Sequence, residues 1–223
     1  AAEPGWRLDL RYEHINQDRP MAGSRRVAVG QVPQHHDEVK TVNRNVLATL
    51  DYTADDRWGV SLTVPASDRS HTHIHNHRGA KITQHWDYAR VGDVRVLGRH
   101  QWRAEDAERM SLDYYGVNVG VKLPTGERDV RSAAGDRAER TLQPGTGTTD
   151  LLLGAYYSGV LPASGSSWFV QGLWQAPMNS REDYRPGQRY SLDAGYRYEV
   201  TERAGLMLQA NAVHRERDLF LVS

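Results

Sequence analysis

The sequence predicts an all-β protein: an antiparallel up-and-down transmembrane β-barrel, with residues 1–223 forming a single outer-membrane domain. Three observations predict it. Segments alternate between apolar and polar residues with a period of two, short and long connections alternate between these segments, and aromatic residues stand near the segment ends. Outer-membrane barrels combine these features, with short periplasmic turns and long extracellular loops.

The composition excludes several other classes. The 28 basic and 28 acidic side chains give a net charge of zero, which excludes a nucleic-acid binder driven by bulk positive charge. Mean hydropathy is -0.69 and no apolar run approaches the roughly 20 residues of a membrane helix, which excludes a helical membrane protein. Because there is no cysteine, only His, Asp and Glu could hold a metal.

The alternating pattern starts near the N-terminus and recurs along the chain. From Trp6 to Glu13, even-numbered residues are apolar or aromatic and odd-numbered residues are charged, which predicts a strand. Similar alternation predicts further strands at 45–52, 58–64, 94–102, 114–123, 150–157, 168–174, 189–199 and 206–212. These are nine strands, and residues 219–222 resemble the opening of a tenth.

The connections between these segments alternate in length. They are long at 16–37, 65–92 and 124–147, intermediate at 176–188, and short at 53–57, 103–109, 161–166 and 200–203. In an antiparallel sheet the short turns then fall at one end and the long loops at the other, as in an outer-membrane barrel. A sandwich with Greek-key crossings has no reason to separate its loops so cleanly.

The two faces of the predicted strands differ in chemistry. Aromatic residues near strand ends on the apolar face predict girdles at the membrane boundaries, namely Trp6, Tyr12, Tyr52, Trp58, Trp102, Tyr157, Trp168 and Tyr198. The polar face would line the lumen with Arg7, Asp9, Arg11, Glu13, Arg95, Arg99, Asp113, Lys122, Asp150, Arg189, Asp193, Arg197 and Glu199. Two interpretations of these charges stay open: paired ladders that fill and stabilise the barrel, or a conducting, selective lumen.

Barrel closure sets an expectation for the whole protein. A bacterial barrel has an even number of strands, because an open edge in lipid leaves backbone groups without hydrogen-bond partners. Nine strands and a fraction cannot close, and the junction of Asp218 with Leu219 leaves almost no loop. We therefore expect roughly 10 to 12 strands in the complete protein, with C-terminal strands lacking from this sequence.

Two motifs carry a family resemblance. The first is Lys122-Leu123-Pro124-Thr125-Gly126, and the second runs from Leu142 to Asp150 as Leu-Gln-Pro-Gly-Thr-Gly-Thr-Thr-Asp; Gly92-Asp93 before a strand matches too. With these motifs the chain resembles the MetA-type phenol-degradation family of outer-membrane transporters, over most of the region from Val60 to Val213. The resemblance implies a barrel in a Gram-negative outer membrane that transports small compounds, aromatic or apolar ones among them.

A histidine run is the strongest chemical signal in the chain. Its candidate metal ligands are His71, His73, His75, His77 and His85. In a strand, residues two apart lie roughly 6.6 Å apart on one face, so a His-x-His pair can chelate one ion, whereas the whole run spans about 20 Å. Either two pairs bind separately, or an extracellular loop curls and recruits His85 or Asp68. Neutral imidazoles suit Zn, Cu or Ni; the alternative is a solvated polar loop.

The functional prediction follows from these features. The chain lacks a Gly-x-Ser-x-Gly elbow and a phosphate-binding loop, so we expect no enzyme, no catalytic residue and no required cofactor. We expect a channel or transporter for small solutes in the bacterial outer membrane, with a His-rich loop that binds transition-metal ions. The expected partners are outer-membrane lipid and a small-molecule or metal-ion solute, without nucleic acid. The alternatives are a non-conducting surface metal-binding or interaction protein and a soluble β-sandwich metalloenzyme.

Overall fold

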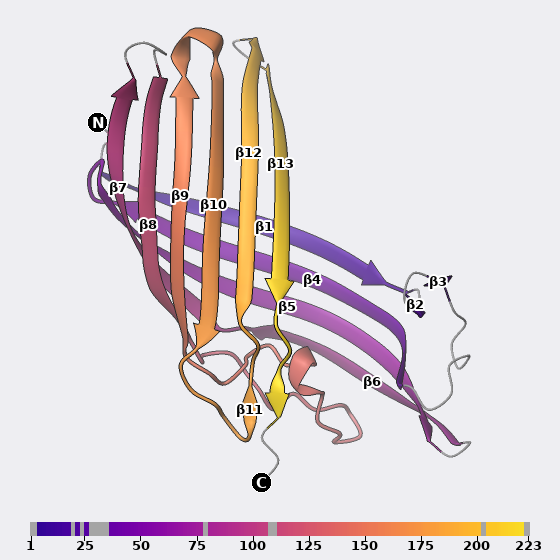
Figure 1. The fold of residues 1–223 in the computed structure, drawn as a ribbon. Helices are drawn as coiled ribbons and strands as arrows, with labels where there is room; N and C mark the ends of the chain where they lie inside the picture. The colour runs from indigo at the N-terminus through magenta and orange to yellow at the C-terminus, as the bar shows by residue number, and fades with distance from the viewer. Residues whose placement is uncertain are drawn as a thin grey trace.

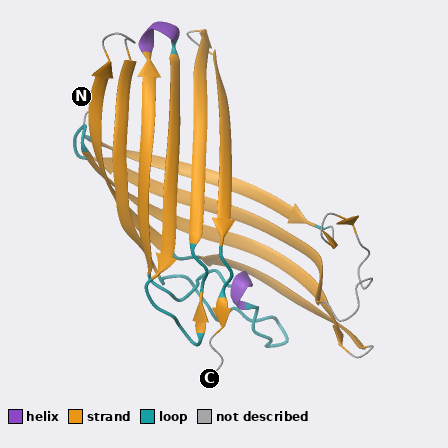
Figure 2. Cartoon of the chain, viewed as in Figure 1, coloured by secondary structure: helices purple, strands orange, loops and turns teal. Residues whose placement is uncertain are grey.

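The computed structural model of the protein describes residues 4–18, 21–22, 25–26, 36–77, 80–106, 111–201 and 204–220. These residues form one large antiparallel sheet that curls into a half-barrel, with a set of turns at one end and long loops at the other (Figure 1). Strands dominate the chain, and the only helical elements of the described residues are two short 3-10 turns (Figure 2). The predicted all-β antiparallel fold is confirmed.

Ten strands make up the sheet. They are β1 (Gly5–Gln17), β4 (His36–Thr53), β5 (Trp58–His77), β6 (Ala80–Val91), β7 (Val94–Asp106), β8 (Ser111–Leu123), β9 (Asp150–Leu161), β10 (Ser166–Pro177), β12 (Arg189–Thr201) and β13 (Ala204–Arg215). The main path runs β1-β4-β5-β7-β8-β9-β10-β12-β13, and β6 pairs with the far part of β5. Among the described residues, β1 and β13 are the edges of this path and do not pair with each other.

The shorter elements lie in the connections. They are β2 (Met21–Ala22), β3 (Arg25–Arg26), η1 (Arg140–Leu142), η2 (Pro162–Ser164), β11 (Tyr184–Arg185) and β14 (Leu219–Phe220). The nine predicted strands are all present, but the expected tenth is wrong: β14 pairs with β11 outside the main sheet. Residues 221–222 lie outside the described part of the chain, so a strand total of 10 to 12 stays a prediction.

The long loop predicted at 65–92 is also wrong. Instead, β5 continues to His77 while paired with β4, and β6 returns along it from Ala80 to Val91. The prediction failed because apolar alternation ends near Val64, whereas backbone pairing needs no apolar face. Strands that extend past an apolar zone can be polar on both faces, so a polar sequence there does not distinguish strand from loop.

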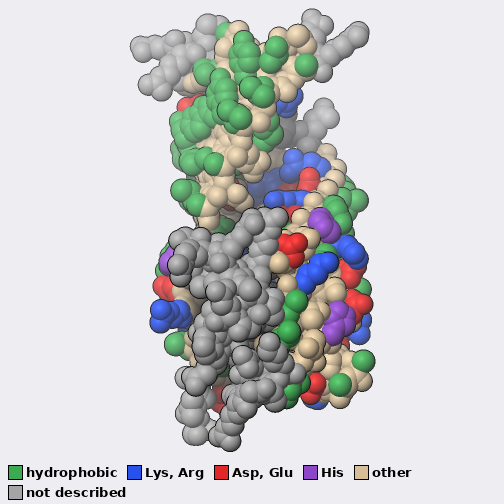
Figure 3. All heavy atoms as spheres, turned by 90° about the vertical axis from the view of Figure 1, so that its right-hand side faces the viewer, with side chains coloured by type: hydrophobic (Ala, Val, Ile, Leu, Met, Phe, Trp, Pro, Cys, Tyr) green, Lys and Arg blue, Asp and Glu red, His purple; other side chains and the backbone are tan. Residues whose placement is uncertain are grey.

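The convex face of the sheet is apolar and exposed. Val119, Leu192 and Leu208 on this face expose 55%, 55% and 63% of their surface. Viewed from the side, hydrophobic side chains gather over the upper part of the molecule, and charged side chains and histidines over the lower part (Figure 3). Since the largest exposed apolar patch of an ordinary soluble monomer covers only a few hundred Å², this surface needs a partner that is itself apolar.

Aromatic rings concentrate on the convex face at the short-turn end. Cross-strand contacts join Trp6 with Tyr52 at 4.7 Å between ring centroids, Trp102 with Tyr115 at 5.5 Å, and Tyr157 with Trp168 at 4.8 Å. Tyr12 lies farther along its strand, opposite Val46, toward the long-loop end. The predicted grouping of aromatic residues near strand ends is therefore present, mainly as a belt at the short-turn end.

One predicted lumen residue lies on the wrong face. Asp113 accepts a hydrogen bond from the Tyr157 hydroxyl at 2.7 Å, so it belongs to the convex aromatic belt. The reason is parity: Tyr115, Val117 and Val119 point outward, and Asp113 shares their odd-numbered register on β8. The prediction that Asp113 faces the interior followed from its charge instead of its position in the strand, and it is wrong.

Candidate functional site: a charged cavity on the concave face

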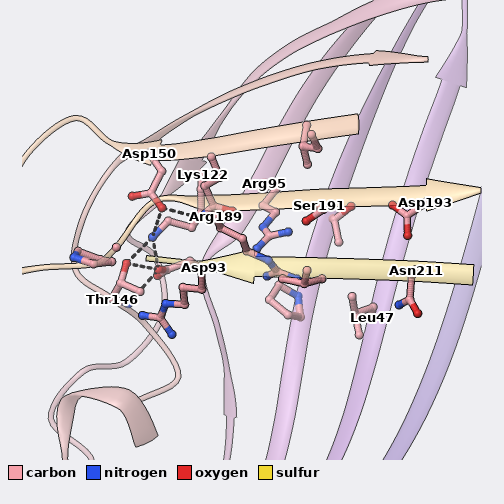
Figure 4. Close-up of a pocket in the computed structure, with 18 of the residues that line it drawn as sticks. Leu47, Asp93, Arg95, Lys122, Thr146, Asp150, Arg189, Ser191, Asp193 and Asn211 are labelled. Carbon is pink, nitrogen blue, oxygen red and sulfur yellow. Dashed lines mark hydrogen bonds and ion pairs between the residues drawn. The ribbon is translucent and has the colours of Figure 1, made fainter. Parts of the chain in front are cut away.

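A cavity of about 630 Å³ opens on the concave face near the long-loop end. Its walls come from strands at both edges and the middle of the sheet, so residues far apart in sequence face one space (Figure 4). The predicted lumen residues that line it are Arg11, Glu13, Arg95, Lys122, Asp150, Arg189 and Asp193. The structure thus brings together seven of the thirteen predicted interior charges.

A buried charge cluster closes one end of the cavity. The Lys122 Nζ lies 2.9 Å from Asp93 Oδ2 and 3.3 Å from Asp150 Oδ2. All three side chains are nearly inaccessible, at 4%, 6% and 2% exposure. Charges this buried need paired partners, because an isolated one would cost several kcal/mol in lost hydration. Lys122 and Asp150 are register partners on β8 and β9, which fixes their approach.

Asp93 also fastens the long loop after β8 to the sheet. Its carboxylate accepts hydrogen bonds from the backbone N–H of Gly126 at 3.0 Å and from the N–H and hydroxyl of Thr146 at 3.0 Å each. The two loop ends meet closely here: a Cβ at Gly145 would lie 2.5 Å from the carbonyl oxygen of Gly126. Position 145 therefore has room only for glycine, since any side chain there would collide with the backbone of Gly126.

The middle of the same loop packs on the sheet through a small apolar core. Trp86 and Tyr88 of β6 are buried against Val130 and Ala138 of the loop, with Leu142 alongside. Trp86 donates from its ring N–H to the carbonyl oxygen of Asp136 at 3.0 Å. The loop at 124–149 is thus a folded part of the molecule rather than a solvated connection.

The loop between β10 and β12 contacts the loop after β8 from the side. Arg137 Nη2 lies 3.2 Å from Glu182 Oε2, and Arg140 also pairs with Glu182. The hydrogen bonds from Arg140 and then Arg137 hold the pKa of Glu182 below its ordinary value. Glu182 adopts a left-handed backbone conformation with φ of 48°, which is uncommon for a residue other than glycine. Because Glu182 and Arg137 are partly exposed, their ion pair adds little to the stability of the fold. Its main effect is to fix how the two loops lie against each other.

The other predicted interior residues lie outside the cavity. Arg99 of β7 forms an ion pair with Asp51 at 2.6 Å nearer the short-turn end, and Arg197 approaches Glu199 at 3.7 Å. Arg7 and Asp9 sit on edge strand β1, opposite Asp51 and Thr49. The concave face therefore carries paired charges toward the short-turn end and a charged cavity toward the long-loop end. Whether these charges fill the barrel or line a conducting lumen stays a prediction.

The histidine run lies in β5 and β6 rather than in a loop. His71 and His73 are buried on the concave face, with His71 Nε2 3.0 Å from His73 Nδ1. Thr41 Oγ1 lies 2.6 Å from His71 Nδ1, and Gln84 Oε1 lies 3.0 Å from His73 Nε2. The placement of this run in a loop, with its curled-loop binding mode, is therefore wrong, and its extracellular position stays a prediction.

The remaining candidate ligands do not join this pair. His85 binds Thr72 at 2.8 Å, and Thr72 lies on the opposite face from its neighbours His71 and His73. Asp68 is on that opposite face too, where it pairs with Arg44 at 3.0 Å. The side chains of His75 and His77 lie outside what the structure describes. Within the described residues, no group of three or more His, Asp or Glu side chains is placed to hold a metal ion.

The contacts of Asp93 with Lys122, Gly126 and Thr146 could not be predicted from the alternation in the strands. Asp93 and Thr146 stand in connections, where alternation carries no information about which segments meet. The available signal was the pair of motifs at 122–126 and 142–150 together with Gly92-Asp93, because all three segments meet at this one cluster. These three motifs therefore mark the place where the loop after β8 joins the sheet.

Comparisons with known proteins agree with the fold. No protein-family model matches the chain, and no curated protein sequence matches it. The structure is similar to that of a COG4313 outer membrane channel from Pseudomonas putida F1, with a TM-score of 0.61 and 17% sequence identity. The match covers 98% of this chain and 75% of that one. Over the residues that the structure describes, there is no helix of the length and apolarity that crossing a membrane demands.

Proposed function

We propose that the protein is a β-barrel channel of a bacterial outer membrane that admits small solutes. The observation that carries this proposal is the division of the sheet into an exposed apolar convex face and a charged concave face with a cavity. A lipid bilayer is the partner that such a convex face requires, and a hydrated lumen is what such a concave face can line.

The dimensions of the apolar face support a membrane span. On β12 the convex residues run from Tyr190 through Leu192 and Ala194 to Tyr198. The eight steps from Tyr190 to Tyr198, at about 3.4 Å each, cover about 27 Å along the strand. That length is comparable with the apolar band of roughly 25 Å between the aromatic girdles of outer-membrane barrels. The aromatic belt then marks the periplasmic boundary and the long loops lie outside.

The structural neighbour supports the same function. It is described as an outer membrane channel, and its strands superpose on nearly the whole of this chain. The resemblance to the MetA-type phenol-degradation family points in the same direction and adds a solute class, small aromatic or apolar compounds. Planar-bilayer recording of the full chain tests the proposal: we expect discrete single-channel currents, and the lack of both conductance and solute flux would refute a channel.

A second candidate is a non-conducting barrel that acts at the cell surface. The observation in its favour is the loop at 124–149, which is held on the concave face by Asp93 and by the core at Trp86 and Tyr88. A loop in this position narrows the lumen. The same bilayer recording distinguishes the candidates, because a plugged barrel inserts into the membrane without carrying current.

We also propose that His71 and His73 bind a transition-metal ion, of which Zn, Cu and Ni suit imidazole. The contact of 3.0 Å between His71 Nε2 and His73 Nδ1 supports this, because two nitrogens about 2.1 Å from one ion can approach each other to that distance. Binding would replace the hydrogen bond between the rings. A third ligand would come from solvent or from a neighbouring side chain, as in sites that keep an open position.

Metal binding gives a measurable prediction. Titration calorimetry with zinc should show binding to the detergent-solubilised protein at pH 7.5, and changing both His71 and His73 to alanine should abolish it. Replacing His85 alone should leave the isotherm unchanged, because that ring lies on the other face. Binding should weaken as the pH falls, since protons compete with the metal for the imidazole nitrogens. Identical isotherms for the protein and the double variant would contradict the site.

A further inference from the structure

Three of the four acidic groups that line the cavity, all but Asp193, already have donors or cationic partners. Asp93 accepts from Gly126, Thr146 and Lys122, and Asp150 accepts from Thr148 at 2.7 Å and also from Gln175. Glu13 pairs with Arg11 at 2.8 Å. Carboxylates with several short contacts have little capacity left for a solute. The cavity is therefore not a cation site at these positions.

Two basic side chains in the same cavity have no such partners. Arg95 of β7 and Arg189 of β12 form no hydrogen bond or ion pair with any described residue, and the Nε of Arg189 is buried without a hydrogen-bond partner there. A buried guanidinium donor left without an acceptor costs free energy, so it marks a place where an acceptor is expected. Because the Nε of Arg189 is an N–H donor, the group it lacks is a hydrogen-bond acceptor.

The fold aims both arginines into one space. Arg95 is the register partner of Lys122 on β8, and Arg189 is the register partner of Gln175 on β10. Their side chains extend from different strands toward the same part of the cavity, beside Asp93 and Asp150 (Figure 4). Two like charges held together without a bridging carboxylate repel each other, and an anion between them would relieve this repulsion.

We propose that Arg95 and Arg189 together bind the oxyanion group, carboxylate or phosphate, of a small anionic solute within the lumen. The inference rests on the proposed channel function and specifies its solute class. Guanidinium groups present planar pairs of N–H donors that match the two oxygens of a carboxylate or phosphate. The cavity of about 630 Å³ has room for the solute as well as the anionic group.

The other charged side chains around the cavity do not neutralise Arg95 and Arg189. Arg215 also lines the cavity, but its charge is paired with Asp218 at 2.8 Å. Asp193 is the remaining acid without a partner among the described residues, and it stands four residues from Arg189 on β12. That separation is about 13 Å along a strand, too far for an ion pair with Arg189. An oxyanion at the two arginines therefore meets no competing carboxylate at contact distance.

Binding in detergent tests the inference without needing conductance. The probes are benzoate, inorganic phosphate and benzyl alcohol, and binding to the full chain is followed by NMR line broadening of each probe. We expect benzoate or phosphate to bind and benzyl alcohol, which lacks the charge, to bind at least 10-fold more weakly, since charge-assisted hydrogen bonds are lost. Comparison of benzoate with phosphate identifies the preferred oxyanion. Equal binding of benzoate, phosphate and benzyl alcohol would overturn the proposal.

Variants assign the binding to the two arginines. The double substitution Arg95→Gln and Arg189→Gln should weaken anion binding about 10-fold or more. Arg197→Gln is the matched control, because Arg197 lies on the same strand and face but outside the cavity. If the double glutamine variant does not fold, the double substitution Arg95→Lys and Arg189→Lys replaces it. This variant keeps both positive charges but should lose part of the affinity for the anion. Unchanged affinity in whichever of these double variants folds would overturn the proposal.

Bilayer recording separates this inference from the channel proposal. In a salt gradient the wild-type reversal potential should indicate preference for anions, and Arg95→Gln with Arg189→Gln should shift it toward cations. A protein that binds benzoate through these arginines but carries no current would refute the channel and leave the oxyanion site. A conducting protein without arginine-dependent anion binding would refute the site and leave the channel.

Discussion

Replacing Lys122 with methionine should lower the free energy of unfolding by about 3 to 5 kcal/mol. The substitution keeps the length of the side chain but leaves the carboxylates of Asp93 and Asp150 buried, without their shared cation. Two buried negative charges without a counter-charge must either take up protons or open the cluster to water. Urea unfolding of the protein folded in lipid vesicles measures this cost.

The control for Lys122→Met is Arg44→Met. Arg44 pairs with Asp68 at 3.0 Å, but both side chains are about half exposed, so removing the cation should cost less than about 1 kcal/mol. Adding Asp150→Asn to Lys122→Met should recover part of the lost stability, because one of the two buried charges disappears. Similar losses for Lys122→Met and Arg44→Met would show that the cluster at Asp93 is not buried as described.

Replacing Val119 with arginine should cost about 2 to 4 kcal/mol in a bilayer. Val119 lies midway along the convex face of β8, is 55% exposed in the isolated chain, and would face lipid near the centre of the membrane. An arginine there must bring its charge into hydrocarbon or bend toward the surface, and both are costly. Refolding titrations into vesicles of the protein and the variant give the difference.

The control for Val119→Arg is an arginine on the concave face. Asn211 lines the cavity and is the register partner of Asp193, so the new guanidinium would gain a carboxylate neighbour. Asn211→Arg should therefore cost less than about 1 kcal/mol. Equal costs on the two faces would contradict the assignment of Val119 to lipid.

The sequence predicted the parts of this fold that repeat. The apolar face of β8 and the charged face of β1 follow from a period of two, so nine strands and the division of faces could be predicted. The same alternation also places Asp113 on the convex face, because it shares the odd-numbered positions of Tyr115 and Val117 on β8. The extension of β5 to His77 could not be seen, because its pairing is made by the backbone and leaves no apolar pattern.

The candidate site was predictable only in part. Alternation placed Arg95, Lys122 and Arg189 on the concave face, which is where they lie. It could not show that Asp93 and Thr146 would close on Lys122, because contacts made by loops depend on tertiary folding. The burial of His71 and His73 was hidden for the same reason, since the Trp86 ring that packs against both of them comes from β6, whose pairing with β5 leaves no apolar pattern.

The most direct test of the central claim is the location of the protein itself. The full chain, expressed with a secretion signal in a Gram-negative host, should sediment with the outer-membrane fraction. It should be released only by detergent, because the convex face around Val119 and Leu192 is covered by lipid. Recovery of folded, monomeric protein in the soluble periplasmic fraction without detergent would contradict the membrane barrel and favour a soluble β protein.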